Sequence, residues 1–173
     1  MKTYQHHAMD DAEARHALAD ACKQVETNLP LYTYQCQNHS NGNDIYHGCA
    51  NNQWTCCFWP VDIWLAYEAS REEKFKTAAL IQVDSFADRI ARKVEVDHHD
   101  MGFLYSPTCV AAWKLVGSET GKNAAIAAAD TLGYRFSVMV PPGTDLTTFE
   151  TDATAKAKHF SHFIRDVTPP AQH

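Results

Sequence analysis

The sequence predicts an all-α fold built from helical hairpins, and three observations lead to this prediction. The chain has 173 residues, of which 45% are apolar and 21% charged, as in one ordinary globular domain. Helix-forming residues dominate, and strand-like alternation is confined to a patch at residues 137–140. Two segments repeat each other, so that Ala66 returns as Ala112, 46 positions later.

The first predicted helix covers residues 10–27, which are rich in Ala, Glu and Lys. Acidic residues stand at its start and a basic residue stands near its end, where each charge favours the helix dipole. Residues 28–55 are rich in Asn, Gln and Tyr, and they are predicted to form a polar loop region.

Two helical hairpins are predicted to follow this loop. Their helices cover residues 60–70 and 72–93 in the first hairpin, and residues 107–116 and 119–136 in the second. Ser106 and Pro107 suit the N-cap and the first helical position, so the second hairpin is predicted to begin there.

The repeat separates an inner helix from an outer helix in each hairpin. The outer helices carry matching apolar stripes: Ala79, Val83, Phe86 and Ile90 in one, and Ala125, Ala129, Leu132 and Phe136 in the other. The inner helices are apolar nearly all round, so we expect them to be enclosed on every side. Such hairpins stack into a solenoid or close into a double ring, an α/α barrel (toroid). Ala-rich helices also resemble one another by chance, which is the alternative reading of the repeat.

Charge and hydropathy exclude two function classes. The net charge is −6, which argues against a nucleic-acid partner because phosphate binding needs clustered Lys and Arg. No window approaches the ~18 apolar residues of a membrane span, and the first residues lack the apolar core of a signal peptide. We therefore expect a soluble, cytoplasmic protein with no membrane partner.

The chain contains six cysteines and no C-x-x-C pair. In a cytoplasmic protein, reduced and mostly buried thiols are the expected state. The alternative is a zinc site, although the spacings do not form the usual two-ligand knuckles. Its ligands would come from Cys36, His39, His47, Cys49, Cys56 and Cys57. We expect no metal and no cofactor.

The repeat also aligns the loops that lead into the inner helices. A shift of 46 places Trp54 on Asp100 and Trp59 on Tyr105, so both loops are predicted to reach the same end of the ring. His98 and His99 lie at that end as well. Aromatic rings beside a carboxyl group are typical of a carbohydrate site, where the ring stacks on the sugar and the acid donates a proton. The alternative is that the tryptophans are core anchors.

Other polar groups have weaker functional interpretations. A metal site is not favoured at His98, His99 and Asp100, because three adjacent residues rarely bind the same ion. Asp62 interrupts an apolar run, so it either caps a helix or faces the cavity of the ring, and capping is favoured. Asp84 and Arg89 recur as Asp130 and Arg135, which indicates a structural role.

Three segments resemble the unsaturated glucuronyl hydrolases of glycoside hydrolase family 88, over about residues 29–136. They are W-T-C-C-F-W-P-V-D-I-W-L-A-Y-E (Trp54–Glu68), D-H-H-D-M-G-F-L-Y-S-P-T-C-V-A-A-W-K-L-V-G (Asp97–Gly117) and A-A-D-T-L-G-Y-R-F (Ala128–Phe136). The H-D-x-G-F-x-Y-S element at His99–Ser106 is the most specific of these signals. The resemblance implies an α/α barrel of six hairpins, of which this sequence holds two.

The resemblance also implies an activity and a set of site residues. Members act on the unsaturated disaccharides that lyases release from glycosaminoglycans, and they add water across the C4=C5 bond of the sugar. The catalytic carboxylate of the H-D-x-G-F element maps onto Asp100. The substrate-binding positions map onto Trp54, Trp59, His99 and Tyr105.

The sequence departs from the family pattern in two places. Cys57 stands where the family has Gly, and the resemblance stops after Phe136. We therefore predict a partial barrel domain at residues 1–136 and a divergent tail at residues 137–173. The resemblance also implies a second catalytic carboxylate, which lies further along the chain in the family. It has no counterpart in this tail, because Asp145, Glu150 and Asp152 are only nearby carboxylates.

Our hypothesis is a truncated, split or frameshifted family member of impaired or absent activity, with a second polypeptide as the partner that completes the barrel. A non-catalytic helical-repeat module that binds an acidic sugar or a protein is the alternative function. A related alternative is an unsaturated rhamnogalacturonyl hydrolase, although the H-D-x-G-F element favours the first family.

Overall fold

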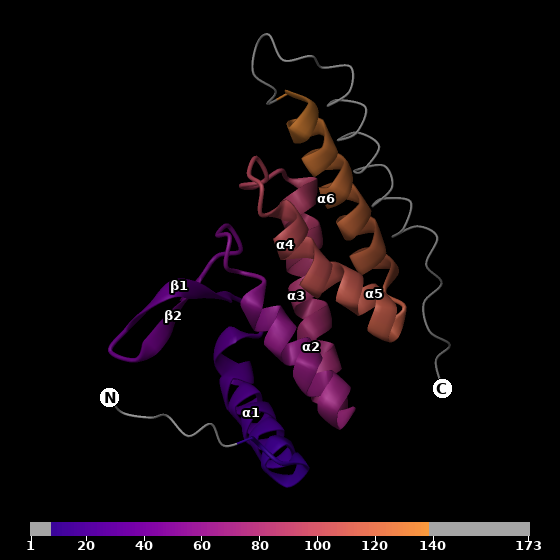
Figure 1. Cartoon of the computed structure of the whole chain (residues 1–173). Helices are drawn as coiled ribbons and strands as arrows, with labels where there is room; N and C mark the ends of the chain where they lie inside the picture. The colour runs from indigo at the N-terminus through magenta and orange to yellow at the C-terminus, as the bar shows by residue number, and fades with distance from the viewer. Residues whose placement is uncertain (1–7, 139–173) are drawn as a thin grey trace, which may run out of the picture.

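The computed structural model describes residues 8–138, together with the side chains of residues 8–134 (Figure 1). Residues 139–173, which hold most of the predicted tail and the carboxylates at 145, 150 and 152, lie outside the described residues. The elements in chain order are α1 (Asp11–Tyr32), β1 (Cys36–Gly42), β2 (Ile45–Cys49), α2 (Phe58–Ser70), α3 (Glu73–Ala91), α4 (Met101–Tyr105), a π-helical turn η1 (Ser106–Val110), α5 (Ala111–Val116) and α6 (Glu119–Val138). Across residues 8–138, no helix has both the length and the apolar composition needed to cross a membrane.

Helix α1 begins as the sequence predicts and continues further. Asp10 and Glu13 form a capping box, in which each carboxylate accepts the backbone N–H of the other residue. The helix passes through Pro30 and ends at Tyr32, whose ring is buried against Trp59. The predicted helix end near residue 27 was therefore wrong. Packing of the last turn on the core outweighs the helix-breaking effect of Pro30.

The predicted polar loop contains a β-hairpin, which the sequence analysis missed. Strands β1 and β2 pair antiparallel around a two-residue turn at Asn43 and Asp44. Both residues have positive φ, 53° and 62°, as a type I′ turn requires. The predicted strand patch was wrong where it is described, because Ser137 and Val138 continue helix α6.

The first helical hairpin, α2 with α3, is confirmed. Trp59, Ile63 and Trp64 place one face of α2 in the core. On α3, the predicted stripe of Ala79, Val83, Phe86 and Ile90 is buried. The stripe therefore forms the contact between α3 and the inner helices.

The second hairpin is confirmed, but its inner helix begins earlier than predicted. Helical structure starts at Met101, so Ser106 and Pro107 lie inside the helical run rather than at its start. Pro107 has no N–H to give to the preceding turn, and the backbone widens into the π-helical turn η1 instead of ending. The hairpin turns at Gly117, which takes the left-handed conformation with φ 69° and ends α5.

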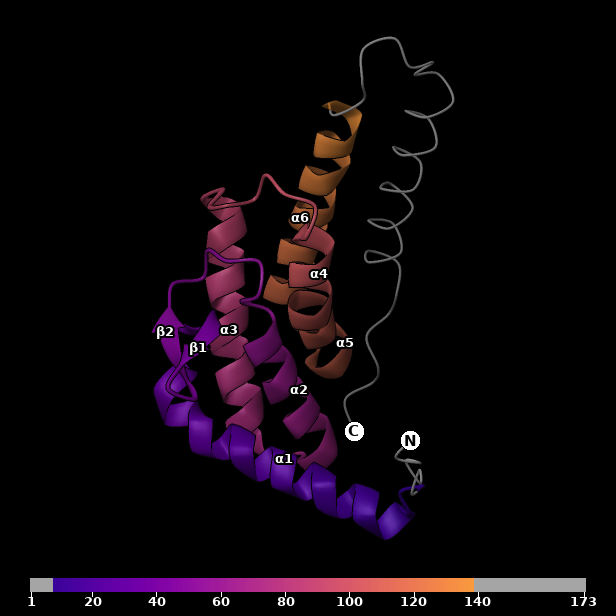
Figure 2. The ribbon, with the colours of Figure 1, turned by 60° about the vertical axis from the view of Figure 1, so that its left-hand side comes forward.

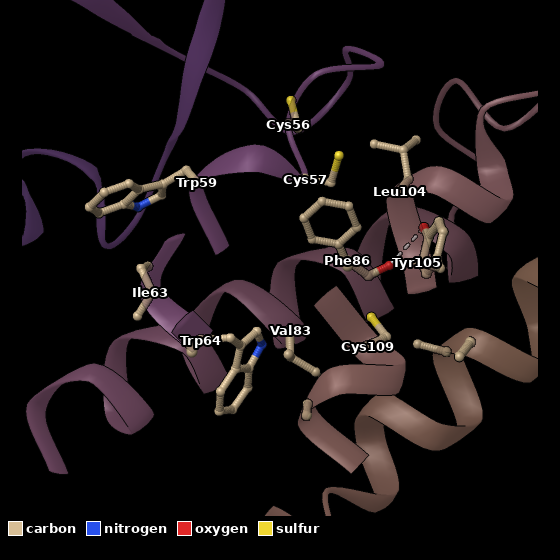
Figure 3. Packing of buried hydrophobic residues seen from close by; sticks show 14 of the residues in the cluster. Cys56, Cys57, Trp59, Ile63, Trp64, Val83, Phe86, Leu104, Tyr105 and Cys109 are labelled. Atoms are coloured by element: carbon tan, nitrogen blue, oxygen red, sulfur yellow. Dashed lines mark hydrogen bonds between the residues drawn. The ribbon is translucent and has the colours of Figure 1, made fainter. Parts of the chain in front are cut away.

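The two hairpins lie side by side, and their outer helices α3 and α6 are in contact (Figure 2). The core lies between them, where Phe86 and Tyr105 meet edge to face near Leu104 and Cys109 (Figure 3). The inner helices are joined directly, because the Trp64 indole donates to the Thr108 carbonyl over 3.1 Å. Sequence similarity between the hairpins therefore corresponds to a repeated packing unit.

One face of α2 is open, which corrects the expectation that the inner helices are enclosed on every side. Phe58, Asp62 and Leu65 follow one another at helical spacing and are all exposed. The interpretation of Asp62 as a cap was also wrong, because the N-cap of α2 is Cys57. Among residues 8–138, no helix therefore covers this face of α2.

A single buried amide fixes the end of α1 and the start of β1 to α3. Gln82 is 1% exposed, and its Nε2 donates to the carbonyls of Tyr32, Thr33 and Gln35 at 2.9, 2.8 and 3.2 Å. These carbonyls belong to the last residue of α1 and to the segment after it, where backbone acceptors have no partner within the helix.

We predict that Gln82→Met lowers the free energy of unfolding by about 2–3 kcal/mol, because it removes the amide donor of the partly buried Thr33 and Gln35 carbonyls while conserving volume. Denaturant unfolding measures this loss. Gln24→Met, on the exposed face of α1, is the matched control and is expected to change stability by less than about 0.5 kcal/mol. Equal losses of unfolding free energy in the two variants would show that Gln82 does not fix the end of α1 to α3.

Candidate active site

Arg89 holds together the two loops that the repeat predicts to share one end of the molecule. Its guanidinium is buried, at 1% exposure, at the end of α3. Nη1 donates to Asn51 Oδ1 and to the Gln53 carbonyl, both at 3.0 Å. Nε and Nη2 donate to the carbonyls of Val94 and Glu95 at 3.2 and 2.9 Å. The loop before α2 and the loop before α4 are therefore tied to one cation.

Asp100 stands at the N-terminal end of α4 without capping it, since no side-chain cap hydrogen bond is formed there. Its carboxylate oxygens lie 3.4 Å from His98 Nδ1 and 3.4 Å from His99 Nε2. The carboxyl group is partly exposed, with 27% of the side-chain surface accessible. It is thus both held in place and open to a ligand.

His98 is oriented by backbone groups on both ring nitrogens. Nε2 lies 2.9 Å from the Glu95 carbonyl, which can only accept, and 3.4 Å from Arg89 Nη2, which can only donate. The shorter contact favours the tautomer with the proton on Nε2. Nδ1 then accepts the Asp100 backbone N–H at 3.3 Å. The Asp100 carboxylate therefore lies beside the ring nitrogen that accepts its own backbone N–H.

Two exposed phenylalanines, which the sequence analysis did not single out, meet near the starts of α2 and α4. Phe103 shares a helix face with Asp100 at a spacing of three residues. Its ring meets Phe58 of α2 edge to face, with centroids 5.3 Å apart. The rings are 45% and 47% exposed, so they present an apolar surface to solvent next to an acid. Their signal in the sequence is that both stand in the two aromatic motifs, one at the start of each inner helix.

The predicted sugar-binding residues divide into two groups. Trp54 is 53% exposed on the loop that Arg89 holds, and the His99 side chain is 88% exposed. Trp59 and Tyr105 lie in the core at 2% exposure each. The Trp59 indole donates to the Tyr32 carbonyl at 2.9 Å, and the Tyr105 hydroxyl donates to the Phe86 carbonyl at 3.0 Å. These two repeat-related residues therefore anchor their helices in the same way, and neither ring is accessible to a ligand.

Cys57 of the tryptophan motif lies near Asp100 of the H-D-x-G-F element. The thiol is fully buried at the N-cap of α2. Burial raises its pKa to about 12, and the nearby negative charge of Asp100 contributes to the rise. The residue that departs from the family pattern is thus a close neighbour of the candidate catalytic acid.

Metal binding receives no support from the geometry. Among residues 8–138, no group of three or more His, Cys, Asp and Glu side chains is arranged to hold a metal ion. This finding covers the cysteine and histidine set of the zinc alternative as well as His98, His99 and Asp100. The recurrent Arg89 has a structural role, as the repeat indicates.

Comparison with known proteins gives a consistent picture, although no protein-family model matches the chain. An unsaturated chondroitin disaccharide hydrolase of Streptococcus pneumoniae is 38% identical over 124 residues, which are 72% of this chain and 31% of that protein. An unsaturated glucuronyl hydrolase of Bacillus sp. (strain GL1) is 35% identical over 120 residues, 69% of this chain and 32% of that protein. The chain is similar to part of the unsaturated glucuronyl hydrolases. This confirms the resemblance found in the sequence.

Solved structures of unsaturated glucuronyl hydrolases agree with the fold. The crystal structure of the Streptococcus agalactiae enzyme matches with a TM-score of 0.75 and 29% identity, over 92% of this chain and 46% of that one. The Bacillus sp. GL1 structure matches with a TM-score of 0.67 and 32% identity. The predicted all-α toroid class is therefore confirmed, and the chain spans about a third of the length of the curated hydrolases and less than half of the solved ones.

Proposed function

We propose that this chain supplies the Asp100 half of a hydrolase that acts on unsaturated glucuronyl disaccharides released by glycosaminoglycan lyases. The observation that carries the proposal is the partly exposed Asp100 carboxyl group, whose oxygens lie 3.4 Å from ring nitrogens of His98 and His99. The exposed ring of Phe103 follows three residues later and contacts Phe58. The similarity to named unsaturated chondroitin disaccharide hydrolases supports the substrate class. A cytoplasmic location, as predicted from the sequence, remains part of this proposal.

The proposed reaction is hydration of the C4=C5 double bond of the unsaturated sugar. A proton adds at C4 and water adds at C5, and the resulting hemiketal opens with loss of the second sugar. Asp100 provides a carboxyl group for proton transfer. No cofactor is required for these steps.

We assign the remaining residues by their accessibility. Trp54 and His99 are exposed and are proposed to contact the sugar, and Phe58 and Phe103 are added as an apolar platform. Trp59 and Tyr105 support the site from the core through their bonds to backbone carbonyls. Besides Asp100, direct sugar contact is therefore proposed for four side chains.

We further propose that helices supplied by a second polypeptide complete the ring. The exposed face of α2, formed by Phe58, Asp62 and Leu65, supports this, as does the greater length of the similar hydrolases. The second acid of the reaction would come from that part.

Leu65 tests the open face. Leu65→Gln is expected to leave the unfolding free energy within about 0.5 kcal/mol of wild type, because the side chain is 53% exposed. It is also expected to reduce self-association of the isolated chain in size-exclusion chromatography. The matched change Ile63→Gln, at 0% exposure on the same helix, is expected to cost about 3 kcal/mol or more. Equal costs at both positions would contradict an open face.

The activity is tested by incubating the chain with an unsaturated chondroitin disaccharide and following the ultraviolet absorbance of the C4=C5 bond. Loss of absorbance with release of the second sugar supports the hydrolase. Binding of the disaccharide in calorimetry without loss of absorbance would favour the non-catalytic sugar-binding module. If the chain neither turns over nor binds the disaccharide, both functions are refuted. An unsaturated rhamnogalacturonyl disaccharide serves as the matched substrate control.

A further inference from the structure

Strand β1 contains a bulge, and its residues take no part in the hydrophobic core. The register of β1 with β2 shifts after Gln37, so residues 38–40 stand opposite a single residue of β2. Within the bulge, Asn38 Oδ1 accepts the backbone N–H of Ser40 at 3.3 Å. A bulge gives a side chain a direction that regular strand pairing does not allow, and bulges are frequent beside functional sites. The side chain that this bulge redirects is His39.

His39 holds the side chain of Gln53, in the loop before α2, through two contacts. The His39 backbone N–H donates to Gln53 Oε1 at 3.4 Å, and the ring Nδ1 lies 2.9 Å from the same atom. A backbone N–H can only donate, so the atom that it meets is the amide oxygen. That oxygen can only accept, which requires a proton on Nδ1. The backbone and the ring of one residue therefore donate to one amide oxygen.

Gln53 directly precedes Trp54, and a second element fixes its backbone. The Gln53 carbonyl accepts from Arg89 Nη1 at 3.0 Å. Two residues earlier, the Asn51 side chain donates to Ser85 Oγ of α3 at 3.2 Å. The segment is therefore held between α3 and β1, and Trp54, the next residue, is 53% exposed.

We propose that His39 is a positioning residue for Trp54, which it fixes through the side chain of Gln53. The inference rests on the proposed contact between Trp54 and the sugar, because a ring that stacks on a sugar has to keep one orientation. A side chain that is already held in place loses less conformational freedom when a ligand binds. The β-hairpin thereby contributes to the proposed site without a sugar contact of its own.

The test uses the full chain, in which 5-fluorotryptophan replaces the four tryptophans, and records its fluorine NMR spectrum without ligand. Trp54 is exposed, whereas Trp59, Trp64 and Trp113 are at most 2% exposed and report on the core. The Trp54 resonance is the one that Trp54→Phe removes. His39→Leu removes the ring donor, so it is expected to shift or broaden this resonance and to leave the other three at their wild-type positions.

His39→Asn is the conservative variant, because the asparagine amide offers an N–H donor close to the position of histidine Nδ1. It is expected to return the Trp54 resonance to its wild-type position. His47→Leu, on the exposed strand β2, is the matched control and is expected to leave all four resonances unchanged. An unchanged Trp54 resonance in His39→Leu, or no recovery in His39→Asn, would overturn the proposal. A shift of all four resonances in His39→Leu would also overturn it, because the role would then be a general structural one.

Titration with an unsaturated chondroitin disaccharide separates this inference from the proposed function. The disaccharide is expected to shift the Trp54 resonance of the wild-type chain. In His39→Leu the midpoint of that titration is expected to rise by roughly 2–10-fold, the cost of ordering one side chain on binding. If the disaccharide leaves the wild-type spectrum unchanged, the proposed sugar contact of Trp54 fails, and the spectra without ligand still decide whether His39 positions the ring.

Discussion

Arg89→Met is expected to lower the free energy of unfolding by about 3–4 kcal/mol, because it removes a buried cation that donates to three partly buried backbone carbonyls and one amide oxygen. Those acceptors belong to Asn51, Gln53, Val94 and Glu95. Methionine keeps the aliphatic length of the side chain, so the loss reports hydrogen bonding rather than a cavity. Denaturant unfolding followed by circular dichroism measures it.

Arg92→Met is the matched control for this prediction. Arg92 lies one turn away and pairs with Asp88 on the exposed surface, so its loss is expected to cost less than about 1 kcal/mol. Arg89→Lys should recover little, since one ammonium group cannot reach acceptors on both loops in the planar arrangement of a guanidinium. A cost for Arg89→Met no larger than that of Arg92→Met would show that the loops are held by other contacts.

Asp100→Asn is expected to reduce turnover of an unsaturated chondroitin disaccharide by roughly 10²–10⁴-fold, the usual contribution of a general acid or base. Asparagine has the same size but provides no acidic proton. The melting temperature should stay close to that of wild type, because the Asp100 side chain does not cap α4. Steady-state kinetics and a thermal melt separate the two effects.

Asp84→Asn is the matched control, since Asp84 is an exposed carboxylate on α3. It is expected to retain wild-type turnover. If Asp100→Asn also retained wild-type turnover, the carboxyl group would not take part in the reaction. A lower melting temperature of Asp100→Asn would instead assign the residue a structural role.

The helical hairpins were predictable because the repeat compares the chain with itself. An apolar stripe that recurs in two helices indicates a common packing surface, and Val83 and Phe86 do lie in the core. The same offset aligned Trp59 with Tyr105, and both proved to be anchors that bond to a backbone carbonyl. The core-anchor alternative was therefore right for Trp59, whereas Trp54 is exposed.

The β-hairpin and the start of α4 could not be predicted in the same way. Most residues of β1 and β2 are exposed on both faces, so no alternation of apolar residues marks the strands. Their signal was the turn at Asn43 and Asp44, which suits positive φ. For α4, Pro107 indicated a helix start, because a proline inside a helix is costly unless the backbone widens around it.

The carbonyl of Glu95 receives hydrogen bonds from both Arg89 and His98. Because one of these donors is a cation embedded in the core, the imidazole tautomer next to Asp100 is dictated by the interior packing of α3 and not by the groups a ligand meets. Sequence changes at residues 94 and 95 that move this carbonyl would then permit a ring flip, although no side chain in contact with a ligand had changed.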